Sequence, residues 1–388
     1  MNIQKTAAEE TLGFMLPTRK VESFHYTDLR SLVKEMPAAI EIADTAGDNY
    51  QRLVPAFRLP FFDGQYFADL GDELPKGVKV TNGVAKANSS DINDAIVGMN
   101  AVTPGDAIEV VIDGDGLSET ALGLAHIANS EGATGCYHKV VVKSGSDAQI
   151  VDRYLSGDGI NHLSNSVSEL VMEQGSKAVW YIVQQESEVA TRLARFNVTL
   201  AQDADLSIFI LNAGGKLVRQ EIKVSVNGEN AKLAIRGVNL VGDNAHIDVT
   251  TVLEHNVPNT NAEELFRNVV AGDGHGIFQG QIKVAQPAQK TDAQMACNTL
   301  LLTDEGDFSA KPELEIFADD VICAHGATVT DIEDAHMFYL RARGIDEKTA
   351  RSLLIKAFVD EVVEEFDPGE DIELALRGVI DNWLDENI

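Results

Sequence analysis

The central part of the chain, residues 126–329, consists of short hydrophobic runs separated by small polar turns. In runs such as 206–211 and 246–253, β-branched and aromatic residues recur at every second position or fill the whole run. Both patterns are typical of β-strands, the first with one buried face and the second with two. We therefore expect this region to be almost entirely β-structure.

The turns between these runs resemble one another and recur at a regular step. Asp203 follows Gly175 by 28 positions, Gly228 follows Asp203 by 25, and Asp273 follows Gly228 by 45, which is close to twice the step. A repeat made of strand, turn and strand predicts a β-solenoid, in which each coil buries its apolar side chains only against its neighbours. A β-sandwich also has closely spaced turns and remains the alternative on pattern alone.

The hydrophobic period changes on both sides of this region. Residues 330–388 read as three amphipathic helices, with Asp331 and Asp346 at the starts of the first two, whereas residues 1–125 alternate helical patches with loops. The chain is thus predicted to have a mixed N-terminal region, a solenoid over 126–329 and a C-terminal helical region. The apolar residues of the last helices exceed what so small a unit buries alone, so we expect them to face both the solenoid and a partner.

Composition narrows the classes of function. The chain has 61 acidic and 31 basic residues, a net charge of −30, while 44% of its residues are hydrophobic. Such a charge repels nucleic acid backbones and anionic lipid surfaces, and the hydrophobic content indicates a folded protein. No apolar stretch approaches the ~18 residues of a membrane span, and the N-terminus lacks a secretory pattern, so a cytoplasmic protein is expected.

Familiar catalytic and nucleotide-binding motifs do not occur in the sequence. Gly214, Gly215 and Lys216 are followed by Leu217, which offers no Mg²⁺ ligand, so they do not form a phosphate-binding loop. The glycines of 272–276 have the wrong spacing for a dinucleotide site and are predicted to form a solenoid turn. We therefore expect that the chain itself neither binds nor hydrolyses ATP.

One short segment could bind a metal. Cys323 and His325 are two residues apart, so on a strand they point to the same side, separated by about 6.6 Å along the strand. A thiolate and an imidazole suit iron–sulfur clusters, Zn or Cu, but two ligands leave a four-coordinate site half empty, so a partner must supply the rest. The alternative is a packed thiol beside a hydrogen-bonded histidine.

The remaining candidates have simpler explanations. Cys297 is expected to be a small buried residue, and Cys136 has only His138 near it in the sequence. Three widely spaced cysteines exclude a disulfide framework. Lys290 and Asp292 are placed to pair across a turn. Three further histidines lack metal-ligand spacing and are expected to be solvated or hydrogen-bonded: His246, His255 and His275.

Several segments in order resemble the SufB/SufD family of the SUF iron–sulfur cluster assembly system, and more closely its SufD branch. They are Pro-Thr-Arg-Lys at 17–20, Tyr-Thr-Asp-Leu at 26–29, Gln-Lys-Thr-Asp at 289–292, Lys-Pro-Glu-Leu-Glu-Ile at 311–316, Cys-Ala-His-Gly-Ala-Thr-Val at 323–329 and Phe-Tyr-Leu-Arg-Ala-Arg-Gly-Ile at 338–345. The likeness spans nearly the whole chain. Phe24 and His25 depart from it, since the family usually has Trp and Lys there.

The resemblance implies a right-handed parallel β-helix between helical terminal regions. It also implies pairing with SufB through the β-helix, docking of a SufC ATPase on the C-terminal helices, and a transient iron–sulfur cluster or iron site shared with SufB. In the family pattern His325 matches the interface histidine and Cys323 its neighbouring thiol. A homodimer of the isolated chain is a further possibility. The alternatives are a SufB-like scaffold in its own right or, in a different class, a β-helix enzyme acting on polysaccharide.

Overall fold

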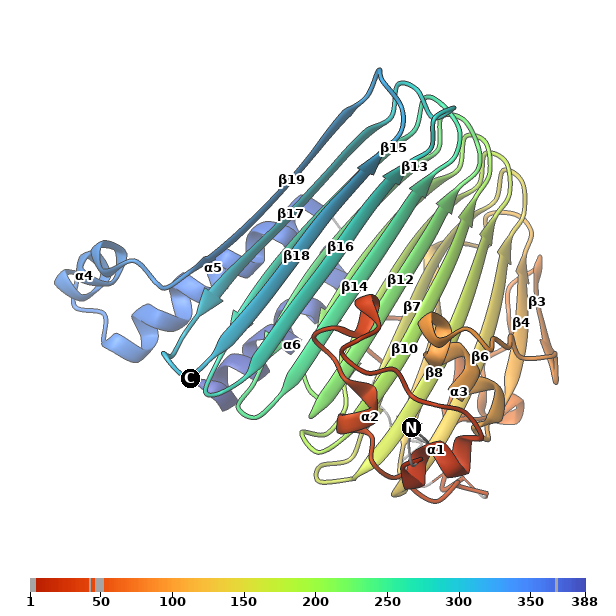
Figure 1. Cartoon of the computed structure of the whole chain (residues 1–388), viewed down its shortest axis with the longest axis horizontal. Helices are drawn as coiled ribbons and strands as arrows, with labels where there is room; N and C mark the ends of the chain where they lie inside the picture. The colour runs from red at the N-terminus through yellow and green to blue at the C-terminus, as the bar shows by residue number, and fades with distance from the viewer. Residues whose placement is uncertain (1–4, 42, 46–51, 367–368) are drawn as a thin grey trace.

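The computed structural model describes residues 5–41, 43–45, 52–366 and 369–388. Most of the chain winds into a solenoid of long strands (Figure 1). The strands are β1 Ala56–Phe62, β2 Gln65–Tyr66, β3 Val78–Asn82, β4 Ala107–Ile112, β5 Leu117–Ala128, β6 Gly132–Val142, β7 Asp147–Ser156, β8 His162–Met172, β9 Lys177–Gln185, β10 Thr191–Leu200, β11 Asp205–Asn212, β12 Leu217–Val226, β13 Lys232–Val241, β14 His246–His255, β15 Asn261–Val270, β16 His275–Val284, β17 Asp292–Leu301, β18 Asp307–Ile316 and β19 Ile322–Thr330.

Successive strands alternate between two sheets. One sheet holds ten strands, the odd-numbered strands from β5 to β19 with β1 and β2 at one end, and the other holds nine, the even-numbered strands from β4 to β18 with β3 at one end. From β4 onwards every strand pairs in parallel with the strand one coil away, as when Thr191 pairs with Leu217. The predicted parallel solenoid is confirmed; its right-handedness stays a prediction.

The turns form ladders along two edges of the solenoid. On one edge the backbone N–H of Asp203 donates to Glu229 O (2.9 Å), and that of Asn230 donates to Asn259 O (3.1 Å). Gly272 and Asp273 lie on the other edge, between β15 and β16. The interpretation of the 45 positions from Gly228 to Asp273 as two repeats was therefore wrong, because these two residues lie in turns on opposite edges of the solenoid.

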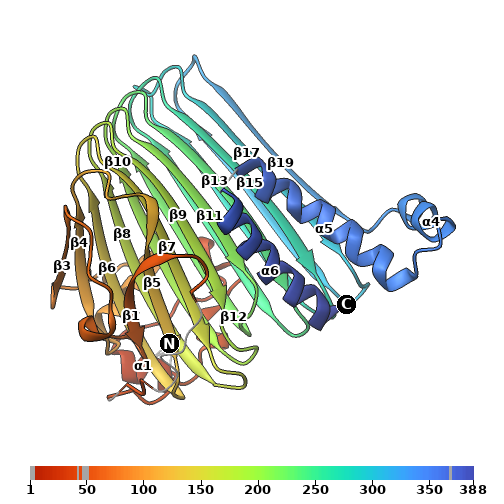
Figure 2. The ribbon, with the colours of Figure 1, turned by 180° about the vertical axis from the view of Figure 1, so that it is seen from behind.

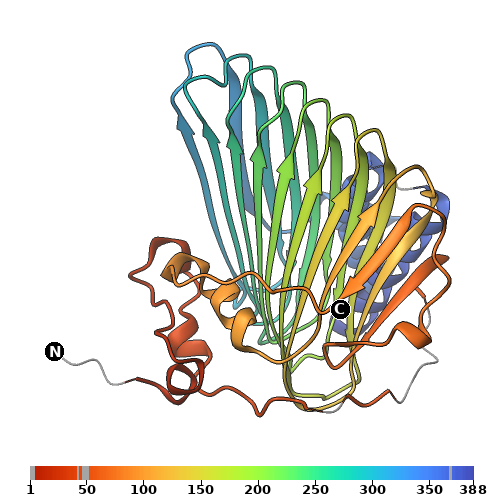
Figure 3. The same ribbon diagram turned by 90° about the vertical axis from the view of Figure 1, so that its right-hand side faces the viewer.

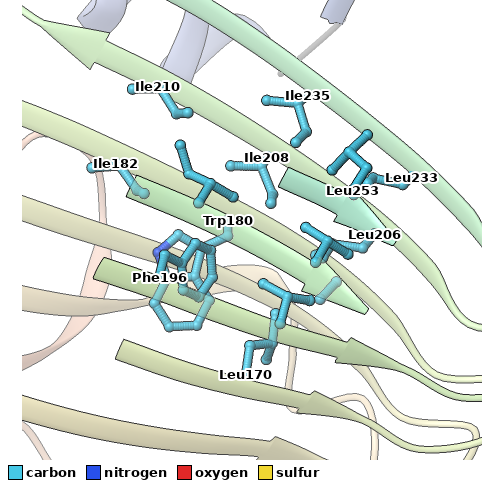
Figure 4. Packing of buried hydrophobic residues seen from close by; sticks show 14 of the residues in the cluster. Leu170, Trp180, Ile182, Phe196, Leu206, Ile208, Ile210, Leu233, Ile235 and Leu253 are labelled. Carbon is cyan, nitrogen blue, oxygen red and sulfur yellow. The ribbon is translucent and has the colours of Figure 1, made fainter. Parts of the chain in front are cut away.

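Apolar side chains from both sheets fill the interior, as Figure 4 shows around Trp180 and Phe196. These two rings lie 4.7 Å apart between centroids, and each side chain is no more than 1% exposed. Because side chains two positions apart on a strand share a face, each strand of the inner coils contributes a row of residues to this core. Each coil is covered by the next, and only the end coils lack a neighbour on one side.

The N-terminal segments cover the outer face of the nine-stranded sheet (Figure 3). Phe24 is fully buried there, beneath the guanidinium of Arg219 at 4.4 Å from the ring centroid. Arg219 and the Thr27 hydroxyl both contact the buried carboxylate of Asp248. The N-terminal elements on this face are α1 Ala7–Leu12, η1 Glu22–Phe24, α2 Leu29–Leu32, η3 Ile92–Asp94 and α3 Ala95–Val102, of which α3 packs on β8 and β10. A further short helix, η2 Ala68–Leu70, packs against β1 of the ten-stranded sheet.

The C-terminal helices are α4 Asp334–Ala342, α5 Glu347–Phe366 and α6 Glu370–Asn387. Helices α5 and α6 lie along the outer face of the ten-stranded sheet, whereas α4 projects beyond it (Figure 2). Asp346 caps α5 as predicted, accepting from Thr349 N at 3.0 Å, but α4 starts after Glu333 and not at Asp331. No described helix is both long and apolar enough to cross a membrane.

Candidate functional site

The last coil, formed by β18 and β19, ends both sheets of the solenoid (Figure 1). Every residue of β19 is exposed except Cys323, which is partly buried. Each of these edge strands has only one neighbour in its sheet among the described residues. Edge strands of this kind offer free backbone N–H and C=O groups for pairing with another chain.

Cys323 and His325 lie on the core-facing side of β19. In the parallel register Cys323 pairs with Ala293 and His325 with Met295, and both partners on β17 are buried in the solenoid core. A further coil would cover Cys323 and His325 in the same way. Since the described chain ends its strands here, His325 is exposed to solvent.

The thiol of Cys323 is a metal ligand that would have to lose its proton. Its partial burial raises its pKa above the usual value, and the nearby Asp292 carboxylate adds to this rise. Metal binding displaces the thiol proton, so a metal ion could offset both effects. Among the described residues, no third His, Cys, Asp or Glu lies close enough to Cys323 and His325 to complete a metal site.

The turn leading into β19 is held by the 289–292 segment. Asp320 N donates to Gln289 Oε1 at 2.9 Å, and Ile322 N donates to Thr291 O at 2.9 Å. Lys290 forms an ion pair with the Asp320 carboxylate. The predicted pairing of Lys290 with Asp292 was wrong, because the turn one coil further along lies directly over Lys290.

Large apolar side chains surround this end of the solenoid. Phe317 is 67% exposed and Ile322 66% exposed. We call these residues, together with the less exposed Ile316 and Val329, the terminal rim. Exposed apolar groups gathered on an unpaired sheet edge are typical of a protein–protein interface.

The other side chains considered from the sequence have structural surroundings. Burial raises the pKa of the Cys297 thiol to about 12, which makes it unreactive. Burial lowers the pKa of His246 and of His255 to about 4, and His255 Nδ1 lies 2.8 Å from the Thr260 hydroxyl. His246 Nε2 lies 2.9 Å from the Thr27 hydroxyl. The expectation that these histidines are solvated or hydrogen-bonded is thus confirmed for both.

A second group of metal-binding side chains lies far from β19, in the first coils, and sequence reasoning missed it. One ligand atom each from His126, Cys136 and His138 lies within 4.8 Å of the others. Burial alone would raise the pKa of Cys136, but the two histidines bring it down to about 6. The available signal was the Cys-x-His spacing, which Cys136 and His138 share with Cys323 and His325. His126 comes from the preceding strand, so no local pattern joins it to them.

Comparison with known proteins gives consistent matches. Residues 126–358 match the model of the family described as SUF system FeS cluster assembly, SufBD core domain. The iron–sulfur cluster assembly protein SufD of Escherichia coli is 31% identical over 366 residues, covering 92% of this chain and 86% of that protein. Protein ABCI7, chloroplastic, of Arabidopsis thaliana is 27% identical over 98% of this chain and 86% of its own length. A SufBD family protein of Synechocystis is 24% identical over 94% of this chain and 87% of its own length.

Proposed function

This chain belongs to the SufBD family of SUF-system iron–sulfur cluster assembly proteins and is similar to SufD, and we propose that it acts there as half of a scaffold. In this proposal the last coil pairs with the corresponding coil of a SufB-type partner. His325, with Cys323 beside it, contributes to a nascent iron–sulfur cluster or iron site formed between the two chains. The chain itself performs no turnover, and ATP is hydrolysed by a SufC partner.

The observation that carries the proposal is the open last coil. His325 and Cys323 occupy core-facing positions of β19 that no further coil covers within the part of the chain that the structure describes. A partner that continues the two sheets would bury the terminal rim and bring its own ligands to these two side chains. A two-ligand site on each chain is incomplete until the chains meet, which restricts cluster assembly to the complex.

Helix α4 supports a separate docking site for SufC. None of its residues is buried, and Phe338 and Tyr339 are 76% and 56% exposed. The neighbouring Leu353 of α5 is also exposed, at 45%. These three exposed side chains offer apolar contact area on α4 and α5, in the helical region that the family resemblance assigns to SufC.

Two single changes test the assignment of both surfaces at once. The chain is co-expressed with tagged SufB and SufC homologues from the same organism, and retention of each partner is measured by pull-down. Phe317→Asp should reduce SufB retention at least tenfold and leave SufC retention unchanged. Phe338→Asp should do the reverse, so each variant serves as the folding control of the other.

Three outcomes of this experiment contradict the proposal. Full SufB retention by Phe317→Asp would place the SufB surface away from the last coil. Full SufC retention by Phe338→Asp would place the SufC surface away from α4. A chain that pairs through the last coil only with its own copy, and never with SufB, would instead indicate a scaffold working as a homodimer.

A further inference from the structure

His126, Cys136 and His138 lie inside the solenoid, near its N-terminal end. Cys136 and His138 are core-facing residues of β6, and His126 faces them from β5 in the other sheet. Cys136 is 6% exposed, His138 is fully buried, and His126 is 8% exposed. Three metal-binding groups thus lie at one place in an interior that is mainly apolar.

Each histidine is held by a polar neighbour, as histidine ligands of metal ions usually are. His138 Nδ1 lies 3.2 Å from Ser168 Oγ. Donation from Nδ1 to that hydroxyl leaves the Nε2 lone pair free, and Nε2 has no hydrogen-bond partner among the described residues. His126 Nε2 lies 3.2 Å from Asp152 Oδ1. The Tyr154 hydroxyl donates to the other carboxylate oxygen of Asp152 at 3.1 Å.

Aromatic packing fixes the plane of the His126 ring. Phe61 lies on one face, with 4.6 Å between centroids, and Tyr154 lies on the other, with 4.3 Å between centroids. These three residues are neighbours in the parallel register of β1, β5 and β7. A ring held on both faces and at its edge presents its nitrogen in one direction, which lowers the entropic cost of binding an ion.

A small cavity reaches the group. Its volume is about 20 Å³, and His126 and Cys136 line it together with Thr134, Asp63 and Gly64. A space of this size holds about one water molecule. It therefore provides room for a fourth, non-protein ligand beside His126 and Cys136.

We propose that His126, Cys136 and His138 form a second metal site, which binds one Zn²⁺ or Fe²⁺ ion inside the solenoid. Two imidazoles and a thiolate match the borderline softness of these divalent ions, and three protein ligands with an open position describe a site that accepts a small fourth ligand. Ligand atoms of a tetrahedral zinc site are about 3.3–3.8 Å apart. The ligand atoms of His126, Cys136 and His138 lie within 4.8 Å of one another, so a small rotation of these side chains would bring them to the distances of a zinc site.

The site is independent of the last coil and of the proposed pairing with SufB. Cys136 lies on β6, whereas Cys323 lies on β19, at the other end of the stacked coils (Figure 1). Metal binding by the isolated chain therefore separates the two assignments. The last coil of one chain offers two ligands, and Cys323→Ser removes its thiol, so a thiolate site that the Cys323→Ser variant retains belongs to the His126 group.

The test uses Co²⁺ as a spectroscopic substitute for Zn²⁺ and Fe²⁺. The full-length chain is unfolded and refolded anaerobically with Co²⁺, because the buried site needs an open chain for loading. We expect one Co²⁺ per chain after desalting, a thiolate-to-cobalt charge-transfer band in the near ultraviolet, and a higher Tm than that of the metal-free protein. Cys136→Ser should abolish the band, and His138→Gln should weaken Co²⁺ binding at least tenfold.

Two matched thiol variants and one direct measurement complete the experiment. Cys297→Ser, which removes a buried thiol of β17, and Cys323→Ser, which removes the thiol of the last coil, should both retain the band. If Cys136→Ser fails to fold, X-ray absorption spectroscopy of the Co²⁺-loaded wild type identifies the ligands directly. We expect one sulfur and two imidazoles bound to the cobalt ion. Absence of the band in the wild type, its persistence in Cys136→Ser, or a coordination sphere without sulfur would overturn the proposal.

Discussion

Met295 and His325 are direct neighbours in the parallel ladder of β17 and β19, yet Met295 is 3% exposed and His325 faces solvent. The two positions differ only in whether a further coil follows. Met295 is covered by the coil of His325, and nothing in the described chain covers His325. The same place in the repeat is therefore core in one coil and candidate interface in the next.

The ion pair between Arg219 and Asp248 should be essential for stability. Asp248→Ala removes the carboxylate that contacts Arg219 and the Thr27 hydroxyl, so that Glu221, at 2.9 Å, is left as the carboxylate partner of Arg219. Leaving a buried charge short of a partner costs about 3–5 kcal/mol of unfolding free energy. Urea denaturation measures this cost.

The control for this change is a pair at the surface. Glu173→Ala breaks the pair with Lys143, whose side chain is 41% exposed, and should cost less than about 1 kcal/mol. Equal losses in the two variants would show that the Arg219 site does not anchor the N-terminal segment.

Glu264 should make stability depend on pH. Burial raises the pKa of this carboxyl from 4.5 to about 8, although the Thr251 hydroxyl opposes the rise. The folded state therefore holds a proton that the unfolded state has released, and stability falls by at most about 1.4 kcal/mol per pH unit as pH rises between these two values. Glu264→Gln, which is neutral throughout, should flatten the slope and be the more stable protein at pH 7.5.

Urea unfolding at pH 5.5, 6.5 and 7.5 checks the slope. The matched control is Glu305→Gln, at an exposed position of the turn before β18, which should keep the wild-type pH dependence. A stability that falls over this range by the same amount in the wild type and in Glu264→Gln would contradict the assignment of the slope to Glu264.

The two apolar surfaces of the C-terminal region should respond differently to mutation. Trp383 is 6% exposed and packs among the residues that join α6 to the ten-stranded sheet, so Trp383→Ala should lower the unfolding free energy by about 3–5 kcal/mol. Phe338 is 76% exposed, so Phe338→Ala should change the unfolding free energy by no more than about 0.5 kcal/mol. Thermal and urea unfolding of both variants measure the contrast, and a large loss in Phe338→Ala would mean that α4 is not a free surface.

The repeating part of the fold could be predicted from the sequence because its signals are local. Period-two runs such as 206–211 lie in strands, and glycine and polar turns such as 272–274 form the corners of coils. The edge on which a turn lies could not be predicted, because the turns of both edges have similar composition. This is why the step from Gly228 to Asp273 was misinterpreted.

Contacts between residues far apart in the sequence could not be predicted in the same way. Phe24 stands where the family usually has Trp, and the sequence offered no way to know that it packs beneath Arg219, 195 positions later. Likewise, Cys136 and His138 were visible as a pair, but His126 joins them only because β5 and β6 face each other across the core. Such contacts depend on the register between coils, which no local pattern specifies.

We expect His325 of the last coil to contribute a ligand to an iron–sulfur site that the chain shares with its SufB partner. The most direct test is the iron and acid-labile sulfide content of the purified complex with SufB and SufC after anaerobic reconstitution, compared between wild type and His325→Ala. Because His325 is exposed and not part of the core, the variant should fold and assemble normally, yet hold less than about a tenth of the wild-type iron and sulfide. A His325→Ala complex that holds the full wild-type content would contradict the account.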